Sequence, residues 1–160
     1  GRVCHYQFDV TEVDTDRVVG QYGGMRDNYF YLNETVLNNV LANVGKPMKV
    51  VTCASGDKFV ARKDEKDRLR NEFGADICEM ELAGLAIACE RNNVPLFSVK
   101  VVSDKAEEGA NESFLSIVEK GVAGYEKILP AILKAVTSGA TSLPPARKQR
   151  GNIACVKKEN

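Results

Sequence analysis

The sequence predicts an α/β protein in which helices cover both faces of a sheet. Three observations predict this class. Short apolar runs alternate along the chain with segments that carry apolar residues at helical spacing. Glycine, proline and asparagine separate these segments, as they do at the ends of strands and helices. The 160 residues, 44% apolar and 28% charged, suffice for one domain with a hydrophobic core.

Four runs predict strands. Residues 2–11 are rich in β-branched and aromatic types. Residues 48–54 form a short apolar run that is followed by a Ser-Gly-Asp turn, and residues 75–79 form another short strand. Residues 95–103 are the most uniformly apolar run, and Asp104 ends it. The polar, glycine-containing stretch between the first run and the first helix predicts turns.

Helices are expected between these strands. In residues 33–44 apolar side chains recur at helical spacing behind Asn33, a suitable N-cap. Residues 64–73 predict a charged helix whose Leu69 and Phe73 face inward. The following glycine ends it.

The third and fourth predicted helices differ in character. Residues 80–92 are apolar on nearly all sides, which is typical of a buried helix. Residues 112–136 predict a long amphipathic helix that contains Pro130. From Ser138 the chain turns basic, with five Lys or Arg residues and one Glu over 138–160. We therefore expect a domain at 1–137 and a flexible basic tail at 138–160.

Composition excludes several classes of function. Lys plus Arg equals Asp plus Glu, 22 each, so no overall charge attracts the chain to nucleic acid or to a membrane. The five cysteines are odd in number and lack C-x-x-C spacing, which indicates a reducing compartment, here the cytoplasm. The single histidine, His5, predicts a strand residue with ordinary hydrogen bonds and no metal centre. We expect no cofactor.

Two carboxylates lie where open α/β sheets bind their ligands, just past the carboxyl ends of strands. Glu81 lies in the first turn of the predicted apolar helix, where a buried carboxylate needs partners and can accept two hydrogen bonds, as from a sugar diol. Asp104 follows the apolar run, and an apolar wall beside it would raise its pKa and let it donate a proton to a leaving group. The alternatives are that Glu81 caps its own helix and that Asp104 forms an Asx turn.

An aromatic residue follows a third strand end. Phe59 lies in the segment SGDKFV (55–60) and could stack on a flat ring, or it could be an ordinary core residue. The core is the commoner place for Phe, so this position alone is weak evidence for base binding.

Several segments, taken in order, resemble the nucleoside phosphorylase and nucleosidase superfamily, and within it the 5′-methylthioadenosine/S-adenosylhomocysteine nucleosidases. They are FDVT (8–11), GQ (20–21), SGDKFV (55–60), EMELAGLA (79–86) and NNVPLFSVKVVSD (92–104). The resemblance covers about residues 1–136 and implies a three-layer α/β/α fold with a central mixed sheet. The chain begins with Gly1 and not Met, and the first half of such a fold is absent from it, so we expect a C-terminal portion.

The resemblance implies a role for each matching residue. Met80 and Glu81 hold the ribose, with the Glu accepting from its hydroxyls. Asp104 protonates the five-membered ring of the purine as the glycosidic bond breaks, and Ser103 supports it. Two residues of SGDKFV bind the base: the ring of Phe59 stacks on it, and the backbone of Val60 contacts its edge. The expected reaction is hydrolysis to adenine and a thioribose by a homodimer, with a small purine nucleoside as substrate.

The chain also departs from the family pattern. Aromatic residues usually precede the GQ pair, where this chain has VDTDRVV (13–19), and Lys100 stands where Arg is usual. Two alternatives therefore stay open: phosphorolysis by a purine nucleoside phosphorylase, and an inactive remnant or binding module. We expect the 160-residue chain alone to be inactive, because the group that activates water would belong to the absent half.

Overall fold

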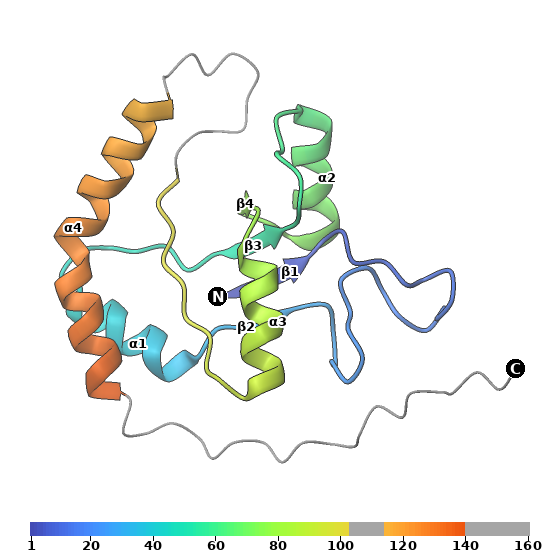
Figure 1. Cartoon of the computed structure of the whole chain (residues 1–160), viewed down its shortest axis with the longest axis horizontal. Helices are drawn as coiled ribbons and strands as arrows, with labels where there is room; N and C mark the ends of the chain where they lie inside the picture. The colour runs from blue at the N-terminus through green and yellow to red at the C-terminus, as the bar shows by residue number, and fades with distance from the viewer. Residues whose placement is uncertain (103–113, 140–160) are drawn as a thin grey trace, which may run out of the picture.

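The computed structural model describes residues 1–102 and 114–139 of the chain (Figure 1). Its elements, in chain order, are β1 (Arg2–His5), β2 (Phe30–Tyr31), α1 (Glu34–Asn43), β3 (Thr52–Ser55), α2 (Lys63–Phe73), β4 (Ile77–Glu79), α3 (Leu82–Asn92) and α4 (Phe114–Gly139). Ser103, Asp104 and all but the first two residues of the predicted tail lie outside the described residues. Strands and helices alternate from β3 onward to α3, as the sequence predicts.

The sheet is mixed and has the strand order β2-β1-β3-β4. β1 pairs with β2 in the antiparallel sense, and with β3 in the parallel sense. β3 and β4 are also parallel, and the register places His5, Ser55 and Glu79 side by side at the carboxyl ends of the three parallel strands. Because carboxyl ends of parallel strands share one edge of a sheet, this row is the natural place for a site.

Helices α2 and α3 pack on opposite faces of the sheet. Neighbouring residues of a strand point to opposite faces. Cys4 and Ala54 accordingly belong to one buried cluster with Leu69 and Phe73 of α2. Val3 and Cys53 belong to a second cluster with Leu82 and Ala86 of α3. The predicted three-layer α/β/α arrangement is therefore confirmed.

A third cluster joins α1 to α4, which lie side by side in Figure 1. Buried Val36 and Val40 of α1 contact a stripe on α4 formed by Ile128, Ile132 and Ala135. These positions recur at helical spacing, so each helix buries one apolar face on the other.

The first two predicted helices are confirmed with their end signals. Asn33 is the N-cap of α1, and its side-chain oxygen accepts from the backbone N–H of Val36 at 3.0 Å. Gly74 ends α2 in the left-handed conformation, with φ of 57°. A glycine adopts this conformation without the steric cost that a Cβ brings.

Strand boundaries differ more from the sequence prediction. The strand predicted at 2–11 ends at His5, because the backbone N–H of Phe8 donates to the His5 carbonyl and turns the chain. The strand predicted at 95–103 is not formed over its described part, 95–102. Its apolar side chains pack without a strand partner: Leu96 belongs to the α3 cluster, whereas Phe97 belongs to the α1–α4 cluster.

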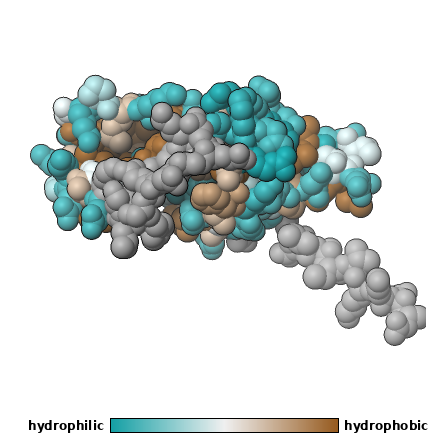
Figure 2. All heavy atoms as spheres, turned by 90° about the horizontal axis from the view of Figure 1, so that it is seen from above, coloured by the Kyte–Doolittle hydropathy of each residue, from teal (hydrophilic) through white to brown (hydrophobic). Residues whose placement is uncertain are grey.

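The surface retains apolar patches. Figure 2 shows hydrophilic residues interrupted by hydrophobic ones on one face of the molecule. Leu85 of α3, Val102 and Leu133 of α4 are among the exposed large apolar side chains. The helix predicted at 80–92 as buried all round is thus buried on one side only, and it begins at Leu82. In the described part of the chain, no helix is long and apolar enough to cross a membrane.

Candidate active site

The candidate site lies at the carboxyl edge of the parallel strands, where β4 leads into α3. Glu79 ends β4, and its side chain is only 13% exposed. The ammonium group of Lys100 donates to its carboxylate at 2.8 Å. The backbone N–H groups of Leu82 and Glu81 donate to the same carboxylate at 2.9 and 3.1 Å. Glu79 is therefore a half-buried anion that accepts hydrogen bonds from Lys100, Leu82 and Glu81.

The electrostatics of Glu79 follow from these contacts. Burial alone raises the pKa of a carboxyl group, because it penalises the charged form. Here the hydrogen bonds from Lys100, Ser55 and the N–H groups of Leu82 and Glu81 outweigh burial and lower the pKa of Glu79 from 4.5 to about 2. Burial likewise disfavours the charged form of Lys100, but the hydrogen bond and charge of Glu79 outweigh it and raise the pKa of Lys100. The pair is ionised at neutral pH.

The first turn of α3 receives its hydrogen-bond acceptors from the strands. Ser55 is fully buried, and its hydroxyl oxygen accepts from the backbone N–H of Ala83 at 2.8 Å. Glu79 accepts from the two preceding N–H groups. The three consecutive N–H groups at residues 81–83 thus bond to side chains of β3 and β4. An unbonded N–H at a helix start is costly when it is shielded from water, so these two side chains fix where α3 begins.

Glu81 occupies the N-cap position of α3, but its side chain makes no capping hydrogen bond. The interpretation that Glu81 caps its own helix is therefore wrong. So is the expectation that Glu81 is buried: its side chain is 70% exposed, and its carboxylate lies 3.9 Å from the ammonium of Lys100. The buried carboxylate at this helix start is Glu79, two residues earlier. Glu81 is left with an accessible carboxylate beside the strand ends.

Met80 lies between the two glutamates and is 42% exposed. A large apolar side chain that stays accessible at a strand edge can contact the apolar face of a ligand. The pair Met80 and Glu81 thus presents an apolar surface and an acceptor at the same place.

The loop after β3 carries the other expected binding residues. Phe59 is 70% exposed, so the alternative that it is a core residue is wrong. Val60 is 6% exposed and packs in the cluster with Leu69. The backbone N–H of Gly56 donates to the Glu79 carbonyl at 3.2 Å, which ties the start of this loop to the end of β4.

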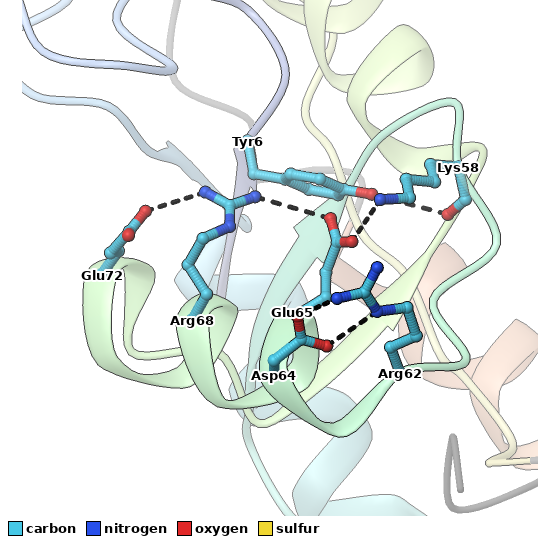
Figure 3. Close-up of polar contacts among 7 residues, drawn as sticks. All are labelled: Tyr6, Lys58, Arg62, Asp64, Glu65, Arg68 and Glu72. Carbon is cyan, nitrogen blue, oxygen red and sulfur yellow. Dashed lines mark hydrogen bonds and ion pairs between the residues drawn. The ribbon is translucent and has the colours of Figure 1, made fainter. Parts of the chain in front are cut away.

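Charged side chains of α2 hold the same loop (Figure 3). Lys58 pairs with Glu65, and Arg68 contacts Glu65 at 3.7 Å and Glu72 at 2.8 Å. The hydroxyl of Tyr6 reaches the Lys58 carbonyl at 3.5 Å. The Lys58–Glu65 pair and the Tyr6 hydroxyl anchor the backbone on the side of the loop that precedes Phe59, while the Phe59 ring stays exposed.

An aromatic cluster beside the site was not predicted. His5 Nδ1 lies 2.6 Å from the Tyr22 hydroxyl, and the Tyr22 ring stacks on Phe8 with ring centroids 3.8 Å apart. Burial lowers the pKa of His5, although the charge of Asp57 opposes this. His5 is a hydrogen-bonded strand residue, as predicted. Its partner, Tyr22, lies 17 positions further along the chain, and a local sequence pattern does not predict a contact over this separation.

The structure therefore brings together part of the expected site. Met80 and Glu81 lie directly after the Glu79 end of β4, and the segment with Phe59 and Val60 begins one strand away. Ser103 and Asp104 lie outside the described residues. Within the described residues, no group of three or more His, Cys, Asp or Glu side chains is placed to hold a metal ion.

Comparison with known proteins places the chain in a family. The model of the phosphorylase superfamily matches residues 5–136, which is most of the chain and includes every element of the site. The chain therefore belongs to the phosphorylase superfamily.

Its relatives within that superfamily are nucleosidases. The aminodeoxyfutalosine nucleosidase of Campylobacter jejuni is 36% identical over 117 residues, 71% of this chain and 49% of that protein. The 5′-methylthioadenosine/S-adenosylhomocysteine nucleosidase of Oceanobacillus iheyensis is 32% identical over 115 residues, 70% of this chain and 49% of that protein. The chain thus spans about half the length of the curated relatives it matches.

Solved structures show the same relationship. Helicobacter pylori futalosine hydrolase superposes with a TM-score of 0.72 at 28% identity, over 83% of this chain and 57% of that one. A Streptococcus pneumoniae MTA/SAH nucleosidase in complex with 8-aminoadenine gives a TM-score of 0.72 at 26% identity, over 84% of this chain and 58% of that one. The predicted resemblance to nucleosidases is confirmed.

Proposed function

We propose that the protein hydrolyses the N-glycosidic bond of a 5′-substituted adenine nucleoside, of the type of 5′-methylthioadenosine or S-adenosylhomocysteine, and releases adenine. The observation that carries the proposal is the state of Glu81. Its carboxylate is exposed at the carboxyl edge of the sheet and is not used in capping, although it occupies a capping position. A carboxylate left accessible in this way can accept both hydroxyls of a ribose.

Each residue has a role in the proposed reaction. Glu81 accepts from the ribose hydroxyls and Met80 contacts the sugar. The exposed ring of Phe59 stacks on the purine, and the backbone of Val60 bonds to its edge. The sugar becomes cationic in the transition state, so a nearby carboxylate stabilises it more than it stabilises the bound substrate.

The leaving purine requires a proton. Asp104, supported by Ser103, supplies it as a general acid to the five-membered ring. Such a donor contributes roughly 10²- to 10⁴-fold to the rate. Asp104 is only four positions from Lys100, whose ammonium is held at the strand edge by Glu79.

A second candidate substrate is aminodeoxyfutalosine, because relatives that carry that name share 36% to 38% identity with this chain. The residues that hold ribose and base would be the same for both substrates. Only the group on the 5′ carbon differs, so the two candidates are distinguished by substrate and not by mechanism.

The test uses the longest natural protein that contains this sequence, purified as the homodimer that we propose or in whatever state it adopts. Adenine release is measured by chromatography from methylthioadenosine, adenosylhomocysteine and aminodeoxyfutalosine, with and without phosphate. We expect release without phosphate, and Asp104→Asn should lower kcat at least 100-fold. Glu72→Gln, on the outer surface of α2, is the control and should leave kcat unchanged.

Three outcomes count against the proposal. A strict need for phosphate indicates phosphorolysis instead. Near-normal activity of Asp104→Asn removes its role as the acid. Absence of release from every substrate supports the remnant or binding-module alternative. The 160-residue chain alone is expected to be inactive, and turnover by it would overturn that expectation.

A further inference from the structure

Glu79 and Lys100 are the most elaborately bonded charged groups at the strand edge, and the proposed mechanism assigns them no role. We propose that Glu79 is a positioning residue that holds both Lys100 and the start of α3, and thereby keeps the Glu81 carboxylate free for the ribose. The inference rests on the proposed function for its kinetic consequence, but its structural part can be tested without any activity.

The start of α3 is capped from outside the N-cap position. A residue at the N-cap position normally bonds its own side chain to N–H groups two or three residues ahead. Glu81 holds that position and makes no such bond. Glu79 reaches forward from the strand and takes the N–H groups of Glu81 and Leu82 at 3.1 and 2.9 Å. Ser55 takes the N–H of Ala83, two residues ahead of Glu81, at 2.8 Å, so the start of α3 is satisfied without the Glu81 side chain.

Lys100 lies within reach of both carboxylates. Its ammonium lies 2.8 Å from the Glu79 carboxylate and 3.9 Å from that of Glu81. Two carboxylates two residues apart repel each other, and one cation between them offsets this repulsion. Lys100 keeps the Glu79 carboxylate in its capping position while Glu81 remains exposed beside it.

Removing Glu79 would leave the start of α3 without this acceptor. The N–H groups of Glu81 and Leu82 would lose their partner. Lys100 would also lose its nearer partner, and the Glu81 carboxylate, 3.9 Å from its ammonium, would be drawn to it. Glu81 would then pair with Lys100 at the helix start and cease to be an acceptor for the sugar. The change therefore weakens both nucleoside binding and stabilisation of the cationic sugar in the transition state.

A stability cycle tests this exchange of partners. In the wild-type protein Glu81→Ala should leave Tm within about 1 °C, because this side chain caps nothing. In a Glu79→Ala background the same Glu81→Ala change should lower Tm by a further 2 °C or so, because it then removes the remaining carboxylate partner of Lys100. Additive effects, with Glu81→Ala equally mild in both backgrounds, would overturn the inference.

Kinetics test the consequence for the ribose. Glu79→Ala should raise KM for the nucleoside and lower kcat, with a fall in kcat/KM of at least about 10-fold, because the Glu81 carboxylate binds the ribose and stabilises the cationic transition state further. The double variant Glu79→Ala/Glu81→Gln should be no worse than the poorer single variant, because both changes remove one carboxylate from the sugar. The control Glu72→Ala should leave KM unchanged. A fall in Tm with wild-type KM would show that Glu79 is only a structural cap.

If Glu79→Ala does not fold, substitutions of Lys100 test the inference instead. Lys100→Met should raise KM several-fold, and Lys100→Arg, which keeps the charge, should restore KM to within about 2-fold. An unchanged KM in Lys100→Met overturns the inference. A wild-type protein that cleaves no nucleoside contradicts the proposed function. The stability cycle still tests whether Glu81 changes its partner when Glu79 is removed.

Discussion

Replacing Glu79 by Gln should remove part of the loss of folding stability that the protein shows as the pH falls. The lowering of the pKa of Glu79 from 4.5 to about 2 corresponds to about 3 kcal/mol of stability at neutral pH, at about 1.4 kcal/mol for each pKa unit. Glu79 is half-buried and shares its ionisation with Lys100, so solvent screening reduces this figure to roughly 1–3 kcal/mol. Gln keeps an oxygen that can accept the N–H groups of α3 but lacks the charge that attracts Lys100.

The direction of the effect follows from proton binding. The folded pKa lies below the unfolded one, so as pH falls the unfolded chain takes up a proton first. The contribution of Glu79 is therefore complete above about pH 4.5 and is lost as pH falls towards 2. The Gln variant has no such contribution at any pH.

The assay is urea unfolding of the wild-type protein and the Glu79→Gln variant between pH 7 and pH 2. We expect the wild-type protein to be more stable by roughly 1–3 kcal/mol at pH 7 and by close to nothing at pH 2. Glu72→Gln removes an exposed carboxylate that pairs with Arg68, and should change stability by less than about 1 kcal/mol. A difference between Glu79→Gln and wild type that stays constant with pH would refute the reasoning, since it would then arise from packing and not from charge.

Two further predictions concern the strand edge. A Cβ at Gly56 would lie 2.7 and 2.9 Å from ring atoms of the buried Tyr6, so Gly56→Ala should destabilise the protein by roughly 1–3 kcal/mol in thermal melting. Gly84 in α3 has open space around it, so Gly84→Ala should stabilise the protein by up to about 1 kcal/mol. Equal effects of the two substitutions would contradict this. Burial lowers the pKa of His5, so its ring resonances in an NMR titration should change below pH 6.5, and the protein should lose stability as pH falls from 6.5 through the folded pKa; titration at or above 6.5 would contradict the burial argument.

Features with local causes were predictable from the sequence. Asn33 begins α1 and Gly74 ends α2 because each acts through its own backbone or its nearest neighbours. Glu81 and Phe59 were also identified as candidates, because their place after strand ends depends only on the order of elements, whereas Met80 and Val60 were identified through the resemblance. Their roles stay predictions, as do those of Ser103 and Asp104.

Features with distant causes were not predictable. The run 95–103 has the composition of a strand, but composition does not reveal whether a partner strand is available, and over its described part the chain forms no strand. The His5–Tyr22 contact joins residues 17 positions apart. The two-residue strand β2 is defined only by its pairing with β1.

The exchange of roles between the two glutamates shows why a site can be located before its residues are assigned. Glu79 and Glu81 are separated by one residue, and a shift of the strand–helix boundary by two positions decides which of them is buried. That boundary is set by acceptors from two strands: Ser55 on the N–H of Ala83, and Glu79 on the N–H groups before it. The buried glutamate satisfies the helix, and the exposed one is therefore available to a ligand. The Glu81 carboxylate is accessible because Glu79 and Ser55 bond the N–H groups at the start of α3, a cause that the position of Glu81 in the sequence does not show.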